Sequence, residues 1–125
     1  MAVNYIASLK TTRMTSVITS VDANAAPATL EIGTAAMAQV LVIITLGDPS
    51  FSVSGDTITM VGVPKSGTAS QTGTAAAARI KDGGGTSVIT GLTVGTSGSD
   101  INLNSTSITN GQTVTISSGT IQHAP

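Results

Sequence analysis

The sequence contains no cysteine, only one histidine and very few charged or aromatic residues. Without cysteine, neither disulfide bonds nor thiolate metal ligands are available, and redox chemistry gives no indication of the compartment. Charged residues make up 9% of the chain, compared with about 25% in ordinary globular domains. An enzyme needs ionisable groups brought together at one place, so this composition argues against catalysis.

The charge balance is also close to neutral. A formal net charge of −1 gives no attraction to nucleic acid or to an anionic membrane, and it favours self-association or burial in an assembly. No apolar run reaches the ~18 residues of a membrane helix, and the longest, Val40–Leu46, is typical of a buried strand. Since no apolar block follows Lys10 and Arg13, the N-terminus is not a secretory signal. We expect a soluble protein made in the cytoplasm.

Threonine, serine, alanine and glycine take the place of the missing residue types, and they suit half-buried strands and tight turns. We expect residues 1–125 to form a single domain, which can bury roughly two-thirds of its unfolded surface. The predicted strands are Thr29–Gly33, Gln39–Leu46, Phe51–Ser54, Thr57–Val61, Ala75–Lys81, Ser87–Val94, Asp100–Asn104 and Thr113–Gln122. Such closely spaced short strands predict a mainly β fold, a jelly-roll-like β-sandwich.

Turn signals separate the strands. Gly55-Asp56 and Asn110-Gly111 are two of them, and the second is a strong hairpin-turn dipeptide because both positions favour positive φ. The segment Ser66–Ala78 is of low complexity. It is interpreted either as a flexible loop or as an extended arm that reaches a neighbouring subunit.

One helix is predicted, over Asn4–Val21, with Asn4 as a candidate N-cap. Its apolar residues recur at spacings near three and four and predict a single apolar stripe: Ile6, Leu9, Met14, Val17, Ile18 and Val21. The segment Asp22–Pro27 ends the helix, because Pro27 blocks its continuation. Many of its residues are β-branched, so this helix needs tertiary or partner packing to persist.

The sequence offers no catalytic residue, cofactor-binding residue or metal ligand that we would assign. His123 lies close to the C-terminus, where a general base would sit on a mobile tail, so it is interpreted as a solvated terminal residue. The segment Asp100–Asn104 has the D-x-N-x-N spacing of a calcium loop. Its apolar residues between the polar ones, and the lack of a suitable later acidic ligand, favour a strand with one polar face.

Other polar groups also have simple structural interpretations. Gly95–Gly98 lacks the lysine and helix of a phosphate-binding loop, so it is predicted to be a plain turn, and Asp82–Gly85 a loop tip between strands. Arg79 and Lys81 share one strand face, which is either solvated or meets an acidic group of a partner. The carboxylates are spread along the chain, and no two of them are close enough in sequence to suggest a pair for acid–base chemistry. They are Asp22, Glu31, Asp48, Asp56, Asp82 and Asp100.

Several segments resemble the capsid decoration (cement) proteins of tailed bacteriophages. They are Asn4 to Arg13, Val21–Ala23, Thr29–Ile32, Arg79–Asp82 with Gly85-Thr86, and Val94–Asn104. The least similar part is Thr34–Ala78. The resemblance implies a β-rich protein that sits outside the capsid shell and clamps neighbouring major capsid subunits, often as a symmetric oligomer. It implies no active site.

The leading hypothesis is therefore a non-enzymatic virion protein that decorates the outer capsid surface and bridges major capsid protein subunits. We expect a homodimer that makes inter-subunit contacts through the predicted helix and through Ser66–Ala78. The alternative is a tail-fibre or receptor/carbohydrate-binding module, although sugar sites usually need exposed aromatics and the chain has only Tyr5 and Phe51. A small hydrolase is the third possibility, and it lacks a convincing general base.

Overall fold

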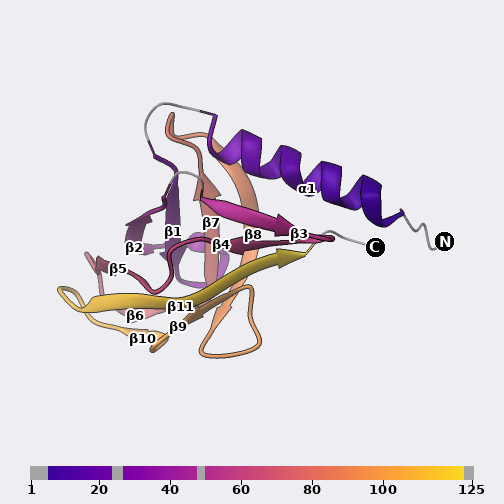
Figure 1. Cartoon of the computed structure of the whole chain (residues 1–125). Coiled ribbons are helices and arrows are strands. Elements are labelled where there is room, and N and C mark those ends of the chain that lie inside the picture. Colours follow the sequence, from indigo (N-terminus) through magenta and orange to yellow (C-terminus); the bar gives the residue numbers. More distant parts are fainter. Residues whose placement is uncertain (1–5, 24–26, 48–49, 123–125) are drawn as a thin grey trace.

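The computed structural model describes residues 6–23, 27–47 and 50–122. They form a mainly β domain with one N-terminal helix and a curled sheet, which confirms the predicted fold class (Figure 1). The elements are α1 (Ala7–Val21), β1 (Thr29–Gly33), the short 3-10 turn η1 (Ala35–Met37), β2 (Val40–Thr45), β3 (Phe51–Ser54), β4 (Thr57–Met60), β5 (Lys65–Thr68), β6 (Gly73–Thr74), β7 (Ala77–Lys81), β8 (Ser87–Gly95), β9 (Ile101–Leu103), β10 (Ser107–Ile108) and β11 (Thr113–Gln122).

The main sheet runs in the order β2-β1-β7-β8-β9-β11-β4-β3, and β6 pairs separately with β10. Among these strand pairs only β8 and β9 run parallel. Strand β11 is shared between two partners on one edge: residues 113–116 pair with β5 and residues 120–122 pair with β4. Because β9 occupies its other edge, β11 joins three parts of the domain.

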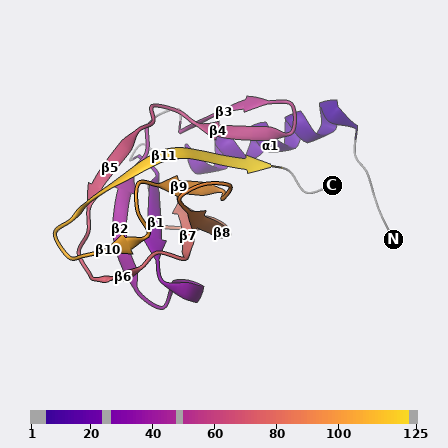
Figure 2. The ribbon, with the colours of Figure 1, turned by 90° about the horizontal axis from the view of Figure 1, so that it is seen from below.

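The sheet curls until β5 comes to lie beside β2, so that the strands nearly close into a barrel (Figure 2). The Ser70 amide donates to the carbonyl of Leu41 at 2.8 Å next to this junction. Gly67 allows the close approach, since a Cβ there would lie 2.9 Å from Ile44 Cγ1 and 3.1 Å from the Ile43 carbonyl. A side chain at position 67 would push the two strands apart.

The core fills the inside of this curl. Strand β1 has Leu30 and Ile32 on its inner face, and in β11 Val114 and Ile116 point inward, two residues apart as on one face of a strand. The largest fully buried side chains come from nearly every part of the sheet: Phe51, Leu30, Ile32, Leu41, Ile44, Ile58, Ile80, Ile101, Leu103, Ile108, Ile116 and Val21. A single apolar core therefore holds the domain together.

Neither interpretation of the segment Ser66–Ala78 is correct. It contributes most of β5, all of β6 and the start of β7, and its Ala69, Ala75 and Ala78 are buried. The segment is thus part of the domain's own sheet and core, and its contact with another subunit stays a prediction. The 3-10 turn η1 and the short strand β10 were not predicted either.

The Asn110-Gly111 prediction is correct only in part. A turn forms there, with the Gln112 amide donating to Thr109 O at 2.9 Å, but only Gly111 has positive φ, at 86°. The flanking strands do not form a hairpin, because β10 pairs with β6 while β11 pairs with β4, β5 and β9. By contrast, Gly55-Asp56 joins β3 and β4 as a tight hairpin.

The helix begins three residues later than expected. Ile6 occupies the N-cap position without a side-chain capping bond, and Asn4, the expected cap, lies outside the described residues. The helix lies against the β3–β4 hairpin and β8 (Figure 1). Its far end is fixed by Asp22, whose carboxylate accepts a hydrogen bond from the Ser50 amide at 3.1 Å.

Only part of the predicted apolar stripe packs on the sheet. Met14 and Val21 are buried and Val17 and Ile18 are partly buried, whereas Ile6 is 71% and Leu9 41% exposed. Leu9 precedes Met14 by five residues, which is roughly 140° around the helix at about 100° per residue, so both cannot face the core. Ile6 is at the helix start, which extends past the hairpin turn (Figure 1). The prediction of one continuous buried stripe is therefore wrong at its N-terminal end.

Candidate interaction surface

The strongest charged cluster lies on the outer face of β1 and β7. Glu31 and Arg79 are directly opposite each other in the register, and Arg79 Nε donates to Glu31 Oε1 at 2.6 Å. Lys81 Nζ lies 3.3 Å from the other carboxylate oxygen. Burial raises the pKa of Glu31. The hydrogen bonds from Arg79 and Lys81, together with their positive charges, lower it by more, so the pKa of Glu31 lies below its usual value.

This cluster corrects both interpretations of Arg79 and Lys81. Neither a solvated face nor an acidic group of a partner is needed, because the acidic partner is Glu31 of the same chain. Both cations are still partly exposed, at 29% and 25% of their side chains, while that of Glu31 is 9% exposed. The arrangement neutralises a nearly buried carboxylate and fixes the β1–β7 register, which is a structural task.

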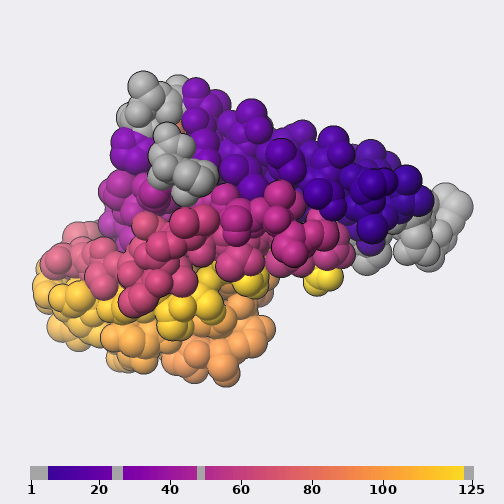
Figure 3. Space-filling model, in the orientation of Figure 1, coloured from indigo at the N-terminus to yellow at the C-terminus, as the bar shows by residue number. Residues whose placement is uncertain are grey.

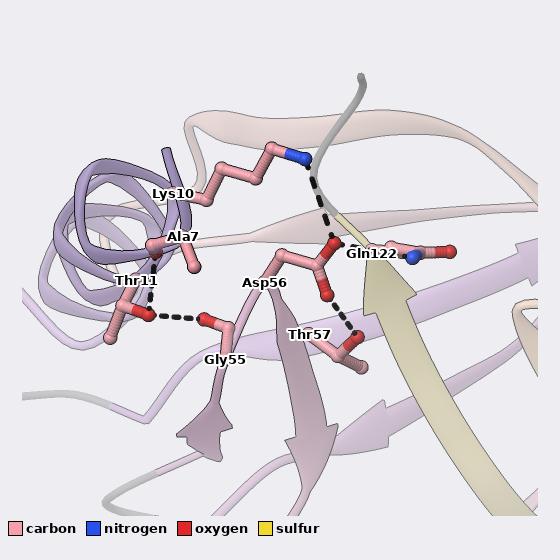
Figure 4. Close-up of polar contacts among 7 residues, drawn as sticks. All are labelled: Ala7, Lys10, Thr11, Gly55, Asp56, Thr57 and Gln122. Atoms are coloured by element: carbon pink, nitrogen blue, oxygen red, sulfur yellow. Dashed lines mark hydrogen bonds and ion pairs between the residues drawn. The ribbon is translucent and has the colours of Figure 1, made fainter. Parts of the chain in front are cut away.

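A second polar cluster joins the helix to the hairpin and to β11 (Figure 4). The Asp56 carboxylate accepts hydrogen bonds from Thr57 Oγ1 at 3.2 Å and from Gln122 Nε2 at 3.3 Å, and Lys10 Nζ lies 4.0 Å away. The bond from Gln122 contributes most to lowering the pKa of Asp56, followed by the bond from Thr57 and the charge of Lys10. Thr11 Oγ1, on the next helix residue, lies 2.6 Å from the Gly55 carbonyl. The cluster anchors the N-terminal half of α1.

The remaining described carboxylates are also occupied within the fold. Asp22 accepts from the Ser50 amide, as described above. Asp82 Oδ1 accepts from the amides of Gly84 and Thr86, each at 3.0 Å, which closes the predicted loop tip between β7 and β8. Asp100 Oδ2 accepts from the Thr93 amide at 3.0 Å. Asp48 lies outside the described residues.

The segment with calcium-like spacing forms strand β9 with a polar face, as predicted. Asn102 Oδ1 accepts from the Ser99 amide, its Nδ2 donates to Ser118 Oγ, and Asn104 Oδ1 accepts from the Thr115 amide. The loop before β9 is a series of bends that contains Gly98 with φ 69°, in keeping with a plain turn. Within residues 6–23, 27–47 and 50–122, no group of three or more acidic, histidine or cysteine side chains is placed to hold a metal. His123 lies outside those ranges.

The rest of the described surface carries many hydroxyls, some amides such as Gln71, Asn104 and Asn110, the cations Arg13 and Lys65, and a few apolar side chains. The large exposed apolar residues are Ile6, Leu9, Ile43 and Val61. Ile6 and Leu9 lie three residues apart on the helix and are therefore neighbours on its surface. Phe51 is 1% exposed and cannot stack on a sugar ring, and Tyr5 is outside the described part of the chain.

Sequence reasoning missed the two polar clusters and found the exposed helix end only as part of a longer stripe. A charged residue in the middle of a predicted strand, as Glu31 is, was the one available signal for a cross-strand ion pair.

No helix in the described ranges is long and apolar enough to span a membrane. In comparisons with known proteins, the chain matches no protein-family model, no curated protein and no solved structure.

Proposed function

We propose that this protein is a non-enzymatic virion component that decorates the outer surface of a phage capsid and stabilises it by bridging major capsid protein subunits, acting as a homodimer. One observation carries the proposal: each described carboxylate is engaged in holding the fold. The described surface offers other molecules mainly hydroxyl, amide and apolar groups, with few charges, which suits contact with another protein. The resemblance to capsid decoration proteins supports the same role.

The exposed N-terminal half of α1 supplies the contact with the capsid protein. Ile6 and Leu9 are exposed, and the Lys10–Asp56 and Thr11–Gly55 contacts hold this half of the helix in place (Figure 4). A pre-positioned helix loses little freedom when it docks into a groove. Full burial of an exposed side chain of this size is worth about 1.5–3 kcal/mol. Since Ile6 is 71% and Leu9 41% exposed, covering both adds about 2–3 kcal/mol to the binding free energy at one subunit junction.

The test uses capsid shells that lack this protein. Adding the wild-type protein should raise the temperature at which the shells dissociate, and the protein should sediment with them. The double variant Ile6→Ser/Leu9→Ser should weaken co-sedimentation at least about tenfold, because it removes about 2–3 kcal/mol of apolar burial, and each single variant should weaken it by less. Ser20→Ala, at an exposed position in the C-terminal half of the helix, is the matched control and should bind like the wild type.

Two outcomes would refute the proposal. One is that wild-type protein leaves the heat resistance of the shells unchanged and stays in the supernatant. The other is that purified particles contain none of it. Binding to a glycan array by protein that does not bind shells would favour a carbohydrate-binding module, whose site would have to use residues other than the buried Phe51.

A further inference from the structure

The turn between β10 and β11 contains a pair of residues whose own groups can react with each other. Asn110 is the only asparagine of the chain that is followed by glycine, and both Asn110 and Gly111 are exposed. At such a pair the backbone nitrogen of the glycine can attack the side-chain amide of the asparagine, because glycine has no side chain to hinder ring closure. The turn is therefore a candidate site of deamidation.

This reaction needs only the chain itself and water. A bond forms between Gly111 N and Asn110 Cγ, and the bond from Cγ to Nδ2 breaks. The side-chain nitrogen leaves as ammonia, with the proton that Gly111 N gives up. Water then opens the succinimide ring at either of its carbonyls. One opening gives aspartate, and the other gives isoaspartate, in which the main chain runs through the former side chain and is therefore longer.

The fold holds the attacking nitrogen in a hydrogen bond. The Gly111 amide donates to the Ala69 carbonyl at 2.8 Å, and the Ala69 amide donates to the carbonyl of Gln112 at 2.8 Å. These two bonds continue the β5–β11 ladder beyond its last register pair, Thr68 and Thr113. The nitrogen attacks only after it has lost its proton, and a proton that is shared with a carbonyl is harder to remove. The bond to Ala69 therefore opposes the first step.

The acceptor is itself anchored in the core. Ala69 is 2% exposed, so its carbonyl moves away only if a buried side chain moves with it. Three further hydrogen bonds fix the turn: the Asn110 amide donates to Thr72 Oγ1 at 3.0 Å, the Thr109 amide to Gln112 Oε1 at 2.8 Å and the Gln112 amide to the Thr109 carbonyl at 2.9 Å. Ring closure has to bring the Asn110 side chain onto the next backbone nitrogen, so the turn must open before the reaction proceeds.

From these contacts we propose that Asn110-Gly111 is a latent deamidation site, which the folded turn keeps unreactive and which reacts when residues 69–72 separate from the start of β11. The two segments lie side by side at the surface in Figure 3, in rose and in yellow, so water reaches this end of the ladder. The inference does not depend on the proposed function.

The modification would mark a chain that has opened. It adds a negative charge at the turn, and isoaspartate also lengthens the main chain where five hydrogen bonds set the position of β11. Because the register of a strand decides which of its side chains face the core, a chain with isoaspartate at position 110 should refold to a less stable state.

The test compares the purified full chain in native buffer and in guanidinium chloride above the unfolding transition, at the same mildly alkaline pH. Peptide mass spectrometry follows which asparagines are converted over time. In the unfolded chain Asn110 should react faster than Asn102 and Asn104, which are followed by leucine and serine. In the folded chain its rate should be at least about tenfold lower. The slowing should match that of hydrogen exchange at the Gly111 amide, because both reactions need the same opening.

Thr72→Val tests the turn contacts, since it removes the acceptor of the Asn110 amide and keeps the shape of the side chain. It should raise the rate in the folded chain about two- to tenfold, as expected for the loss of one hydrogen bond, and leave the rate in the unfolded chain unchanged. Ser70→Ala is the matched control, because this exposed residue lies in the same segment and its side chain makes none of the five hydrogen bonds. Its rates should equal those of the wild type.

Equal rates at Asn110 in the folded and the unfolded chain would overturn the inference, as would a reaction in the folded chain that outpaces the opening measured at the Gly111 amide. Equal acceleration by Thr72→Val and Ser70→Ala would also overturn it. Circular dichroism of each variant shows whether it is folded. If Thr72→Val unfolds, the comparison of deamidation with hydrogen exchange in the wild type still decides the matter.

Discussion

Replacing Glu31 by glutamine tests whether the ion cluster on β1 and β7 stabilises the fold in a pH-dependent way. Glutamine keeps the shape of the side chain and one acceptor oxygen, but it removes the charge that faces Arg79 and Lys81. The change therefore isolates electrostatics from packing.

The magnitude follows from the two contacts at 2.6 and 3.3 Å. A hydrogen bond to a charged group is worth about 1.5–3 kcal/mol. Glutamine keeps an acceptor oxygen for one of the two cations, but its NH2 group is a donor and cannot bond to the other, so the change removes one such bond. We expect the free energy of unfolding at neutral pH to fall by about 2 kcal/mol. The figure of about 3–5 kcal/mol for breaking a fully buried pair is too large here, because Arg79 and Lys81 are 29% and 25% exposed.

The assay is urea unfolding of both proteins, followed by circular dichroism at a series of pH values. The pKa of Glu31 is lower in the folded than in the unfolded chain, so its stabilisation is fully present above the unfolded pKa. It is lost as the pH falls through the folded pKa. The difference between wild type and Glu31→Gln should therefore shrink in acid, while other carboxylates affect both proteins equally.

A difference of about 2 kcal/mol that stays constant down to a pH where Glu31 is protonated would refute the electrostatic reasoning. Equal stability at neutral pH would refute the cluster itself. The double variant with Arg79→Met provides the control: if the two groups interact, the effect of Glu31→Gln should be smaller once Arg79 is gone, and the contact with Lys81 should account for what remains.

Three further predictions use the same unfolding measurement. Met14→Ala should lower the free energy of unfolding by about 2–4 kcal/mol and Leu9→Ala by less than about 0.5 kcal/mol, because only Met14 is buried; equal losses would contradict the orientation of α1. Gly67→Ala should cost about 1–3 kcal/mol through overpacking and speed amide exchange in β2, and unchanged stability would argue against the close β2–β5 approach. Ala36→Gly should raise stability by about 0.5 kcal/mol because φ is 57° at this alanine, while the control Ala38→Gly, with φ −60°, should lower it.

Sequence reasoning located the strands that bury large alternating side chains. Thr29–Gly33, Phe51–Ser54 and Thr113–Gln122 have the predicted bounds, because their apolar residues mark one face clearly. Strands β5 and β6 lack that signal, since their residues are Lys, Ser, Gly and Thr. Their strand conformation comes from pairing with β11 and β10, which lie far along the chain, and local sequence cannot reveal such partners.

The polar clusters were hidden for the same reason. Glu31 and Arg79 are 48 residues apart, and no hairpin turn joins β1 to β7, so nothing local predicts that the two strands are neighbours. The helix, by contrast, was predicted correctly as an element, but the prediction that one continuous apolar stripe along it is buried was wrong. The gap between Leu9 and Met14 is five residues, which places the two side chains roughly 140° apart around the helix, so Leu9 faces solvent when Met14 faces the core.

Strand β11 has a consequence for how the chain reaches its folded state. It is the common partner of β4, β5 and β9, yet it follows all of them in the order of synthesis. Until residues 113–122 leave the ribosome, these three strands have unsatisfied edges that can pair with other chains. Folding that depends on such distant pairings is slow, so the nascent domain is most prone to aggregation just before its last strand is made.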